Sequence, residues 1–167
     1  GLATDSILNE LKFLLAKGDV IIEGGNSHYE DTEKRAEELA RQGIHFLGMG
    51  VSGGEEGALK GPSLMLGGAE EAYPLVAEAL ESIAAKNSDG SPCCAYLGSG
   101  GAGHFVKIVH NGIEYAEMQL LAEAFELAGA NPQNNFTAIH KMFGAWQNTS
   151  SKSYLLDITH ALLNFTE

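Results

Sequence analysis

Two short apolar segments, separated by one amphipathic helix and each followed by a glycine-containing turn, constrain the fold more than any other feature. Residues 20–22 and 44–51 are apolar runs of strand length, and residues 30–42 between them are charged and alanine-rich with one apolar face. Strand–helix–strand units of this kind are almost always parallel. The sequence therefore predicts that the turns at 24–27 and 52–54 emerge side by side at the carboxyl edge of a sheet, where open α/β sheets bind ligands.

The rest of the chain divides into a continuation of this sheet and a helical part. Apolar runs predict further strands at 63–66 and 93–97. Helical spacing of apolar side chains predicts helices at 7–16, 70–85, 103–128, 134–146 and 153–165. We expect an α/β fold: the C-terminal part of a Rossmann-like parallel sheet domain over residues 1–100, followed by the beginning of an all-α domain over residues 101–167.

The net charge restricts the classes of partner that the chain is expected to bind. Asp and Glu number 22 against 10 Lys and Arg, a net charge of −12, which argues against nucleic acid or an anionic membrane as a partner. No apolar run reaches the roughly 18 residues of a transmembrane helix, and no signal peptide opens the chain. Cys93 and Cys94 are adjacent and are expected to be reduced, which favours a cytoplasmic protein.

The predicted long helix carries an unusual polar stripe. At about 100° per residue, one face collects His104, Lys107, His110, Asn111 and Glu114. Apolar side chains occupy the opposite arc: Phe105, Val106, Val109, Ile113, Ala116 and Leu120. The glycine-rich entry at 98–103 permits close approach of another backbone. We expect this entry and the two sheet turns to meet at one cleft; a stripe that only faces solvent is the alternative.

These residue types suit acid–base chemistry on a polar substrate. A lysine in a partly desolvated site gives up its proton more readily, so it can serve as a general base and then as an acid. A nearby glutamate can supply a second proton, and Asn, Ser, His and backbone amides can bind hydroxyl groups. The histidines lack partners at ligand spacing and the cysteines form no CxxC pair, so no metal site is expected.

Four stretches carry a specific resemblance. They read IEGGNS at 22–27, GVSGGEEGA at 50–58, GPSLM at 61–65 and GAGHFVKIVHNGIEYAEMQ at 101–119. Over about residues 1–130 the chain resembles the 6-phosphogluconate dehydrogenases. Related β-hydroxyacid dehydrogenases share the Ser-Gly-Gly and Lys…Asn elements but not the whole Lys-x-x-His-Asn-x-x-Glu-Tyr set.

The resemblance implies oxidation of 6-phosphogluconate at C3 with NADP and release of CO2, giving ribulose 5-phosphate in the pentose phosphate pathway. Lys107 matches the general base, and Glu114 matches the acid that protonates C1 of the enediol. Asn26 and Glu55 match positions at the nicotinamide. The matching substrate contacts are Asn26, Ser52, Gly53, Gly54, His110, Asn111 and Tyr115.

The resemblance further implies a central fragment. The family's N-terminal dinucleotide-phosphate turn and most of its C-terminal helical domain have no counterpart in these residues, so the isolated chain is expected to be inactive. The complete enzyme is expected to be a homodimer. Two alternatives stay open: another β-hydroxyacid dehydrogenase, which would have no use for Glu114 as an acid, and a non-catalytic dimerisation or folding module.

Overall fold

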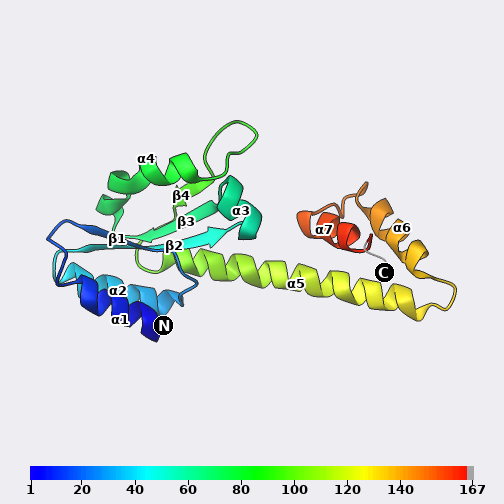
Figure 1. Cartoon of the computed structure of the whole chain (residues 1–167), viewed down its shortest axis with the longest axis horizontal. Coiled ribbons are helices and arrows are strands. Elements are labelled where there is room, and N and C mark those ends of the chain that lie inside the picture. The colour runs from blue at the N-terminus through cyan, green and yellow to red at the C-terminus, as the bar shows by residue number, and fades with distance from the viewer. Residues whose placement is uncertain (165–167) are drawn as a thin grey trace. The chain divides into compact units, whose positions relative to one another are not determined.

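The computed structural model describes residues 1–164, and these belong to two compact units (Figure 1). The first unit is Gly1–His110, and the second begins at Asn111. The division falls within one long helix, α5 (Ala102–Ala130). No helix among residues 1–164 is long and apolar enough to cross a bilayer.

A four-stranded sheet forms the centre of the first unit. Its strands follow the order of the sequence: β1 (Val20–Glu23), β2 (His45–Ser52), β3 (Ser63–Gly68) and β4 (Cys94–Tyr96). Strands β1 and β2 are parallel, which confirms the expected strand–helix–strand unit around α2 (Tyr29–Ala40). The α/β fold class is confirmed, but the sheet is mixed rather than parallel throughout, because β2 and β3 are antiparallel.

The length of the connection explains this correction. A parallel crossover needs about a dozen residues or more to return along the sheet. Only residues 53–62 join β2 to β3, and Ser52 at the end of β2 pairs with Ser63 at the start of β3. The chain therefore turns back at the same edge. We expected the glycine-rich turn after β4 to emerge at the edge where β1 and β2 end. This expectation is wrong, because β4 is parallel to β3 and therefore ends at the opposite edge.

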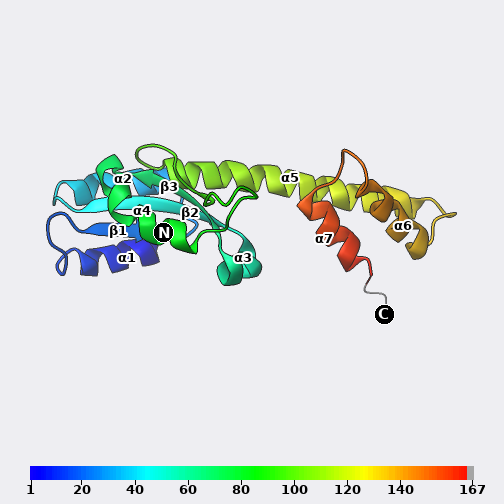
Figure 2. The same ribbon diagram turned by 90° about the horizontal axis from the view of Figure 1, so that it is seen from above.

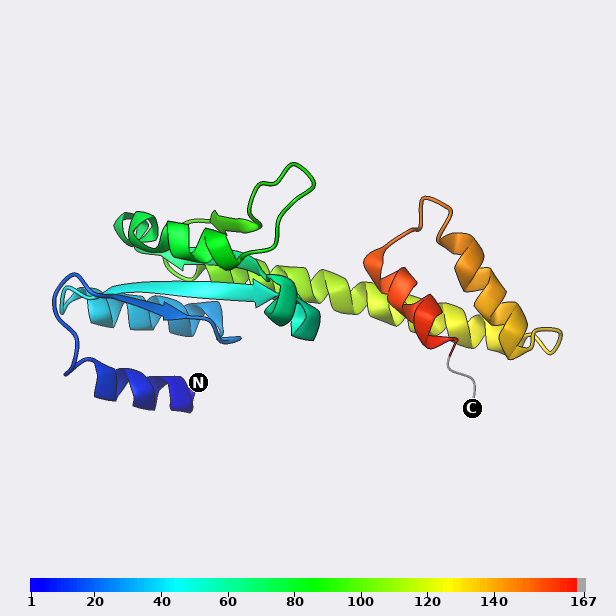
Figure 3. The ribbon, with the colours of Figure 1, turned by 45° about the horizontal axis from the view of Figure 1, so that its top comes forward.

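Helices cover both faces of this sheet. In Figures 1 and 3, α1 (Leu2–Leu11) and α2 lie on one side and α4 (Tyr73–Ile83) lies on the other. On the α2 side, a buried apolar cluster consists of Leu39, Ile44 and Phe46. A second cluster on the α4 side consists of Leu47, Leu64, Leu66, Ala72, Leu80 and Ala84. Successive residues of β2 thus point to opposite faces, as in any strand.

One helical prediction needs correction, and one helix was missed. The helix expected at 7–16 is α1, and it ends at Leu11; Phe13 and Leu14 follow in a turn and are 82% and 80% exposed. The Asp19 carboxylate accepts the Ala16 N–H at 2.8 Å, so this backbone is tied to a loop instead of a helix. Helix α3 (Gly54–Lys60) was not predicted, because its glycines hide the helical pattern. Glu56 and Lys60 stabilise it with an ion pair at 2.7 Å.

The second unit contains the remainder of α5 with α6 (Phe136–Trp146) and α7 (Tyr154–Leu162). Asn135 and Ser153 cap the last two helices, each accepting a backbone N–H three residues ahead. Ile139, Phe143 and Leu156 form the buried centre of this unit. These helices confirm the prediction at 134–146 and the existence of the helix predicted at 153–165. The latter ends at Leu162, earlier than predicted, and residue 165 lies outside the described residues.

Candidate active site

Strand β1 ends in a turn whose two flanking residues are held together. The Ser27 hydroxyl donates to the Glu23 carboxylate across residues 24–26. Ser27 is buried and the Glu23 side chain is 11% exposed, whereas Asn26 between them is exposed. The turn therefore exposes Asn26, while the polar residues on either side of it, Glu23 and Ser27, form a cluster beneath it.

Arg35 of α2 joins the polar cluster of Glu23 and Ser27. Its Nη1 donates to Ser27 Oγ at 3.1 Å and lies 3.4 Å from Glu23 Oε2, and its Nε lies 2.7 Å from Asp5 Oδ1. Burial by itself would lower the pKa of Arg35, but the hydrogen bond that Arg35 donates to Asp5 and the charges of Asp5 and Glu23 raise it above its ordinary value. The same guanidinium lowers the pKa of Asp5, chiefly through the hydrogen bond. The buried cation is thus balanced by two carboxylates.

Strand β2 ends beside this turn with the expected glycines. Ser52 closes the strand, and Gly53 and Gly54 follow with φ of 136° and 57°. Such positive φ values favour glycine over residues with a Cβ. Glu55 comes next, in the first turn of α3, and is exposed. The parallel pairing of β1 and β2 therefore brings Ser52 and the turn carrying Asn26 to one edge of the sheet.

The first turns of α5 lie directly on the sheet. A methyl group at Gly50 of β2 would lie 2.6 Å from Lys107 Cβ, and one at Gly103 would collide with the Gly48 carbonyl oxygen. Glycine in the strand thus permits the helix to approach the backbone. Lys107 is consequently only 9% exposed. Lys107 packs against Gly50, which lies two residues before Ser52. Gly50 and Ser52 therefore face the same side of the sheet.

His104, one turn before Lys107, is the most deeply buried polar residue of this helix face. It is 1% exposed, and its Nδ1 lies 2.7 Å from Thr32 Oγ1 of α2. Its Nε2 is buried without a hydrogen-bond partner among the described residues. Burial lowers the pKa of His104, although the charge of Glu23 opposes the shift. This side chain ties α5 to α2 rather than facing outward.

The burial of this stripe distinguishes, at two positions, between the cleft-facing stripe that we expected and the solvent-facing alternative. In the structure, the buried residues of α5 are Gly103, His104 and Lys107. Members of the apolar arc are instead well exposed: Phe105 48%, Val106 36%, Val109 46%, Ile113 67% and Leu120 66%. The solvent-facing alternative for the polar stripe is thus wrong at His104 and Lys107.

The predicted site residues fall in both units. The first unit contains the residues at the strand ends, Lys107 and the partly buried His110. Further along α5, Asn111 and Glu114 are partly buried and Tyr115 is 66% exposed, all within the second unit. The roles assigned to all of these residues stay predictions.

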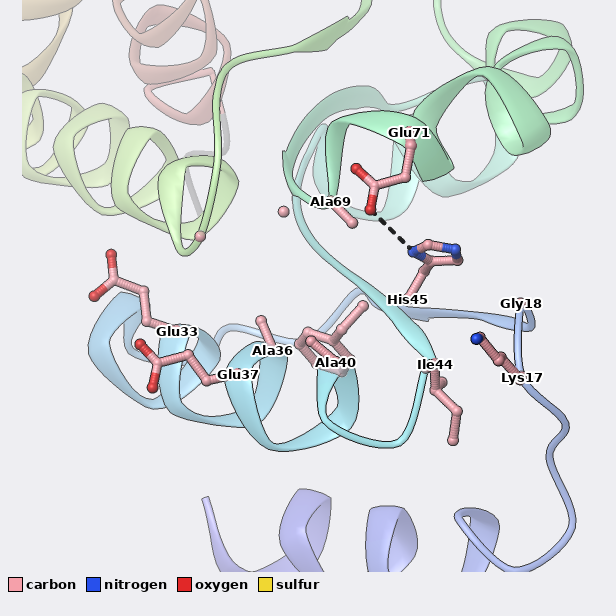
Figure 4. A pocket seen from close by; sticks show the side chains of 14 residues that line it. Lys17, Gly18, Glu33, Ala36, Glu37, Ala40, Ile44, His45, Ala69 and Glu71 are labelled. Atoms are coloured by element: carbon pink, nitrogen blue, oxygen red, sulfur yellow. Dashed lines mark ion pairs between the residues drawn. The ribbon is translucent and has the colours of Figure 1, made fainter.

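The sheet also has a cavity of about 540 Å³, which lies elsewhere (Figure 4). It is bounded by the beginning of β2, by residues after β3, and by one side of α2. Glu33 and Glu37 line one wall, and His45 lies 3.5 Å from Glu71 on another. None of the predicted site residues lines this cavity. No three His, Cys, Asp or Glu side chains within residues 1–164 could hold a metal ion together.

Sequence reasoning missed Thr32 and Arg35. Both are buried on the same face of α2 as Leu39, at the spacing i, i+3, i+7 of a helix face. This spacing was available from the sequence. It was obscured because an arginine is ordinarily assigned to the solvent face.

Comparison with known proteins identifies the family of this chain. Residues 1–98 match the family described as the NAD binding domain of 6-phosphogluconate dehydrogenase, and residues 103–167 match the C-terminal domain of 6-phosphogluconate dehydrogenase. The decarboxylating 6-phosphogluconate dehydrogenase of Raoultella planticola is 54% identical over 159 residues, which cover 95% of this chain and 36% of the relative. That of Treponema pallidum is 50% identical over 163 residues, covering 98% and 33%.

Solved structures show the same relationship. A Plasmodium falciparum 6-phosphogluconate dehydrogenase superposes with a TM-score of 0.91 at 39% identity, over 98% of this chain and 35% of that one. A 3-hydroxyisobutyrate dehydrogenase from Salmonella typhimurium, at 19% identity and a TM-score of 0.73 over 95% of this chain and 55% of that one, shares the fold. The chain spans 33–36% of the length of the two curated relatives above. It belongs to the 6-phosphogluconate dehydrogenase family.

Proposed function

We propose that the full-length protein containing this chain oxidises and decarboxylates 6-phosphogluconate to ribulose 5-phosphate and CO2 with NADP, in the pentose phosphate pathway. One observation carries the proposal. Lys107 is buried against Gly50, two residues before the Ser52–Gly53–Gly54 turn, where β1 also ends. A lysine shielded from water beside a polar sheet edge suits the general base of this reaction.

Lys107 and Glu114 divide the proton transfers in this proposal. Lys107 takes the proton of the C3 hydroxyl, and in its protonated form it then polarises the 3-keto oxygen while CO2 departs. Glu114 protonates C1 of the resulting enediol. The sequence places Glu114 two helical turns after Lys107, a spacing at which side chains share one helix face.

The proposed substrate contacts offer neutral hydrogen-bonding groups. Side-chain amides, a hydroxyl, an imidazole, a phenol and glycine N–H groups can bind the hydroxyls and the carboxylate of a sugar acid. We assign this role to Asn26, Ser52, Gly53, Gly54, His110, Asn111 and Tyr115. In the first unit, exposure of Asn26, Gly53 and Gly54 leaves them accessible to a ligand.

Residues 1–98 belong to an NAD-binding domain family, and NADP is the cofactor that we propose. The Plasmodium falciparum relative was solved in complex with NADP+ and with 6-phosphogluconate. Asn26 and Glu55 would lie at the nicotinamide, and both are exposed in the segments that follow the neighbouring strands β1 and β2. When bound, NADP accepts the hydride from C3. We further propose that the full-length protein is a cytoplasmic homodimer.

The test is a stoichiometric assay of the full-length protein. We expect one NADPH and one CO2 for each 6-phosphogluconate consumed, with NADP preferred over NAD. The isolated 167-residue chain is expected to show negligible turnover under the same conditions. Oxidation without CO2 release would favour a different β-hydroxyacid dehydrogenase. A dimer that neither binds nor converts 6-phosphogluconate would favour the non-catalytic module.

A further inference from the structure

We infer that Glu23, Ser27 and Arg35 form a clamp that positions Asn26, and that Ser27 and Arg35 are therefore positioning residues of this enzyme. The inference rests on the proposed function, in which Asn26 contacts substrate and cofactor. The clamp joins the end of β1 to α2 through buried polar contacts, while the residue that it positions is exposed.

Two glycines make the conformation of this turn depend on contacts with the rest of the unit. Gly24 and Gly25 precede Asn26, and glycine loses more conformational freedom on ordering than any other residue. The Ser27–Glu23 hydrogen bond closes the turn four residues apart, from the residue just before the glycines to the residue just after Asn26. Removal of this bond would release both ends of the glycine segment.

Arg35 stabilises the Ser27–Glu23 hydrogen bond from outside the turn. One nitrogen, Nη1, contacts both Ser27 Oγ and Glu23 Oε2, at 3.1 and 3.4 Å. Its Nε is fixed by Asp5 of α1 at 2.7 Å, so the guanidinium is held from a second element. A planar group held at several donors has little freedom to follow a shift of the turn. The clamp is thus anchored on α1 and α2, both in the first unit.

The burial of these side chains indicates that their contacts stabilise the conformation of the turn. Arg35 is 7% and Ser27 is 9% exposed. Surface ion pairs contribute little to structure, but a buried hydrogen-bonded group left without its partner is costly. The chain therefore resists any movement of the turn that would separate Ser27 from Arg35 or Glu23, and Asn26 is held next to a residue that cannot move freely.

The test uses Ser27→Ala in the full-length enzyme, alone and combined with Asn26→Ala. We expect Ser27→Ala to lower kcat/KM for 6-phosphogluconate about 10- to 100-fold, the range that a small displacement of a positioning group produces. In the Asn26→Ala background, the same change should cost less than about threefold, because the positioned side chain is gone. Equal effects in both backgrounds would overturn the clamp.

Two further variants separate positioning from general stability. Ser27→Thr keeps the hydroxyl and should recover most of the activity that Ser27→Ala loses; no recovery would overturn the inference. Arg41→Ala removes an exposed arginine that pairs with Glu37 at 3.9 Å on the same helix region, and should leave kcat/KM within about twofold. An inactive parent enzyme would overturn the proposed function and the clamp with it. An active parent with an unchanged Ser27→Ala variant would overturn the clamp alone.

Discussion

The two ends of β2 differ in how they use polar residues. At the carboxyl end, Lys107 packs against Gly50, and Glu23, Ser27 and Arg35 form a buried polar cluster under the neighbouring turn. At the amino end, a cavity of about 540 Å³ is lined by alanines, an isoleucine and a phenylalanine, with exposed carboxylates around it. This cavity therefore lies at the end without the predicted catalytic residues.

This contrast supports placing the proposed site at the carboxyl end of β2. The open cavity is only unfilled space in the first unit. Closely packed charged groups, in contrast, are energetically unfavourable unless they are paired. Burying a cation is unfavourable unless it is paired, as Arg35 is with Asp5 and Glu23. Figure 2 shows the sheet of the first unit and its helices from above. The carboxyl end is the place where altered side chains should affect chemistry.

Lys107→Met should produce the largest effect. The replacement keeps a long side chain against Gly50 but removes the amine, so we expect kcat of the full-length enzyme to fall at least about 10³-fold, within the range for a lost general base. Steady-state assays with circular dichroism would check activity and folding together. Lys34→Met, which alters an exposed lysine of α2, is the matched control. A near-normal rate for Lys107→Met would refute its role.

Gly50→Ala should have the next largest effect. The added methyl group would lie 2.6 Å from Lys107 Cβ, so the helix or the lysine must shift. We expect a loss of about 10²-fold in kcat/KM and a destabilisation of about 1–3 kcal/mol. Gly129→Ala, whose methyl group would meet only Ile139 Cδ1 at 3.9 Å, should be neutral or stabilising. Similar results for the two variants would contradict the close approach of α5 to β2.

His104→Gln should change the pH dependence of stability. The pKa of His104 is lowered from its ordinary 6.5, so its contribution is fully present above that value. As the pH falls below about 6.5, the unfolded chain binds a proton that the folded chain does not, and stability declines until the pH reaches the lowered folded value. Melting temperatures at about pH 7.5 and about pH 5 should therefore differ more for the wild type than for His104→Gln. An identical pH dependence would contradict the burial of a neutral imidazole.

Glu71→Gln should have the smallest effect, since it changes the opposite end of the sheet. Glu71 is 70% exposed and lies 3.5 Å from His45 at the cavity. Its loss should change stability by less than about 0.5 kcal/mol and kcat/KM by less than about twofold. Thermal unfolding and the NADPH assay measure both quantities. A large fall in activity would show that the cavity takes part in the reaction, and would break the contrast between the two ends.

Much of the fold was predictable, and the site residues were named without coordinates. The apolar runs at 20–22 and 44–51 correctly indicated parallel β1 and β2. The division into domains at residue 100 stays a prediction: the family matches cover 1–98 and 103–167, while the compact units divide after His110. The direction of β3 was missed because strand patterns carry no information about direction. It depended on the short connection at 53–62.

The sequence by itself determined the order of helices and strands, the parallel β1–β2 pair and the family motifs, because these depend on local periodicity and on residue identity. Only the tertiary structure decided which face of α5 is buried. Helical periodicity separates polar from apolar faces, but Gly48 and Gly50 let the polar face approach the sheet. Tertiary structure likewise joined Asp5, Glu23 and Arg35, which lie far apart in the sequence, because paired charges tolerate burial only where separate elements bring them together.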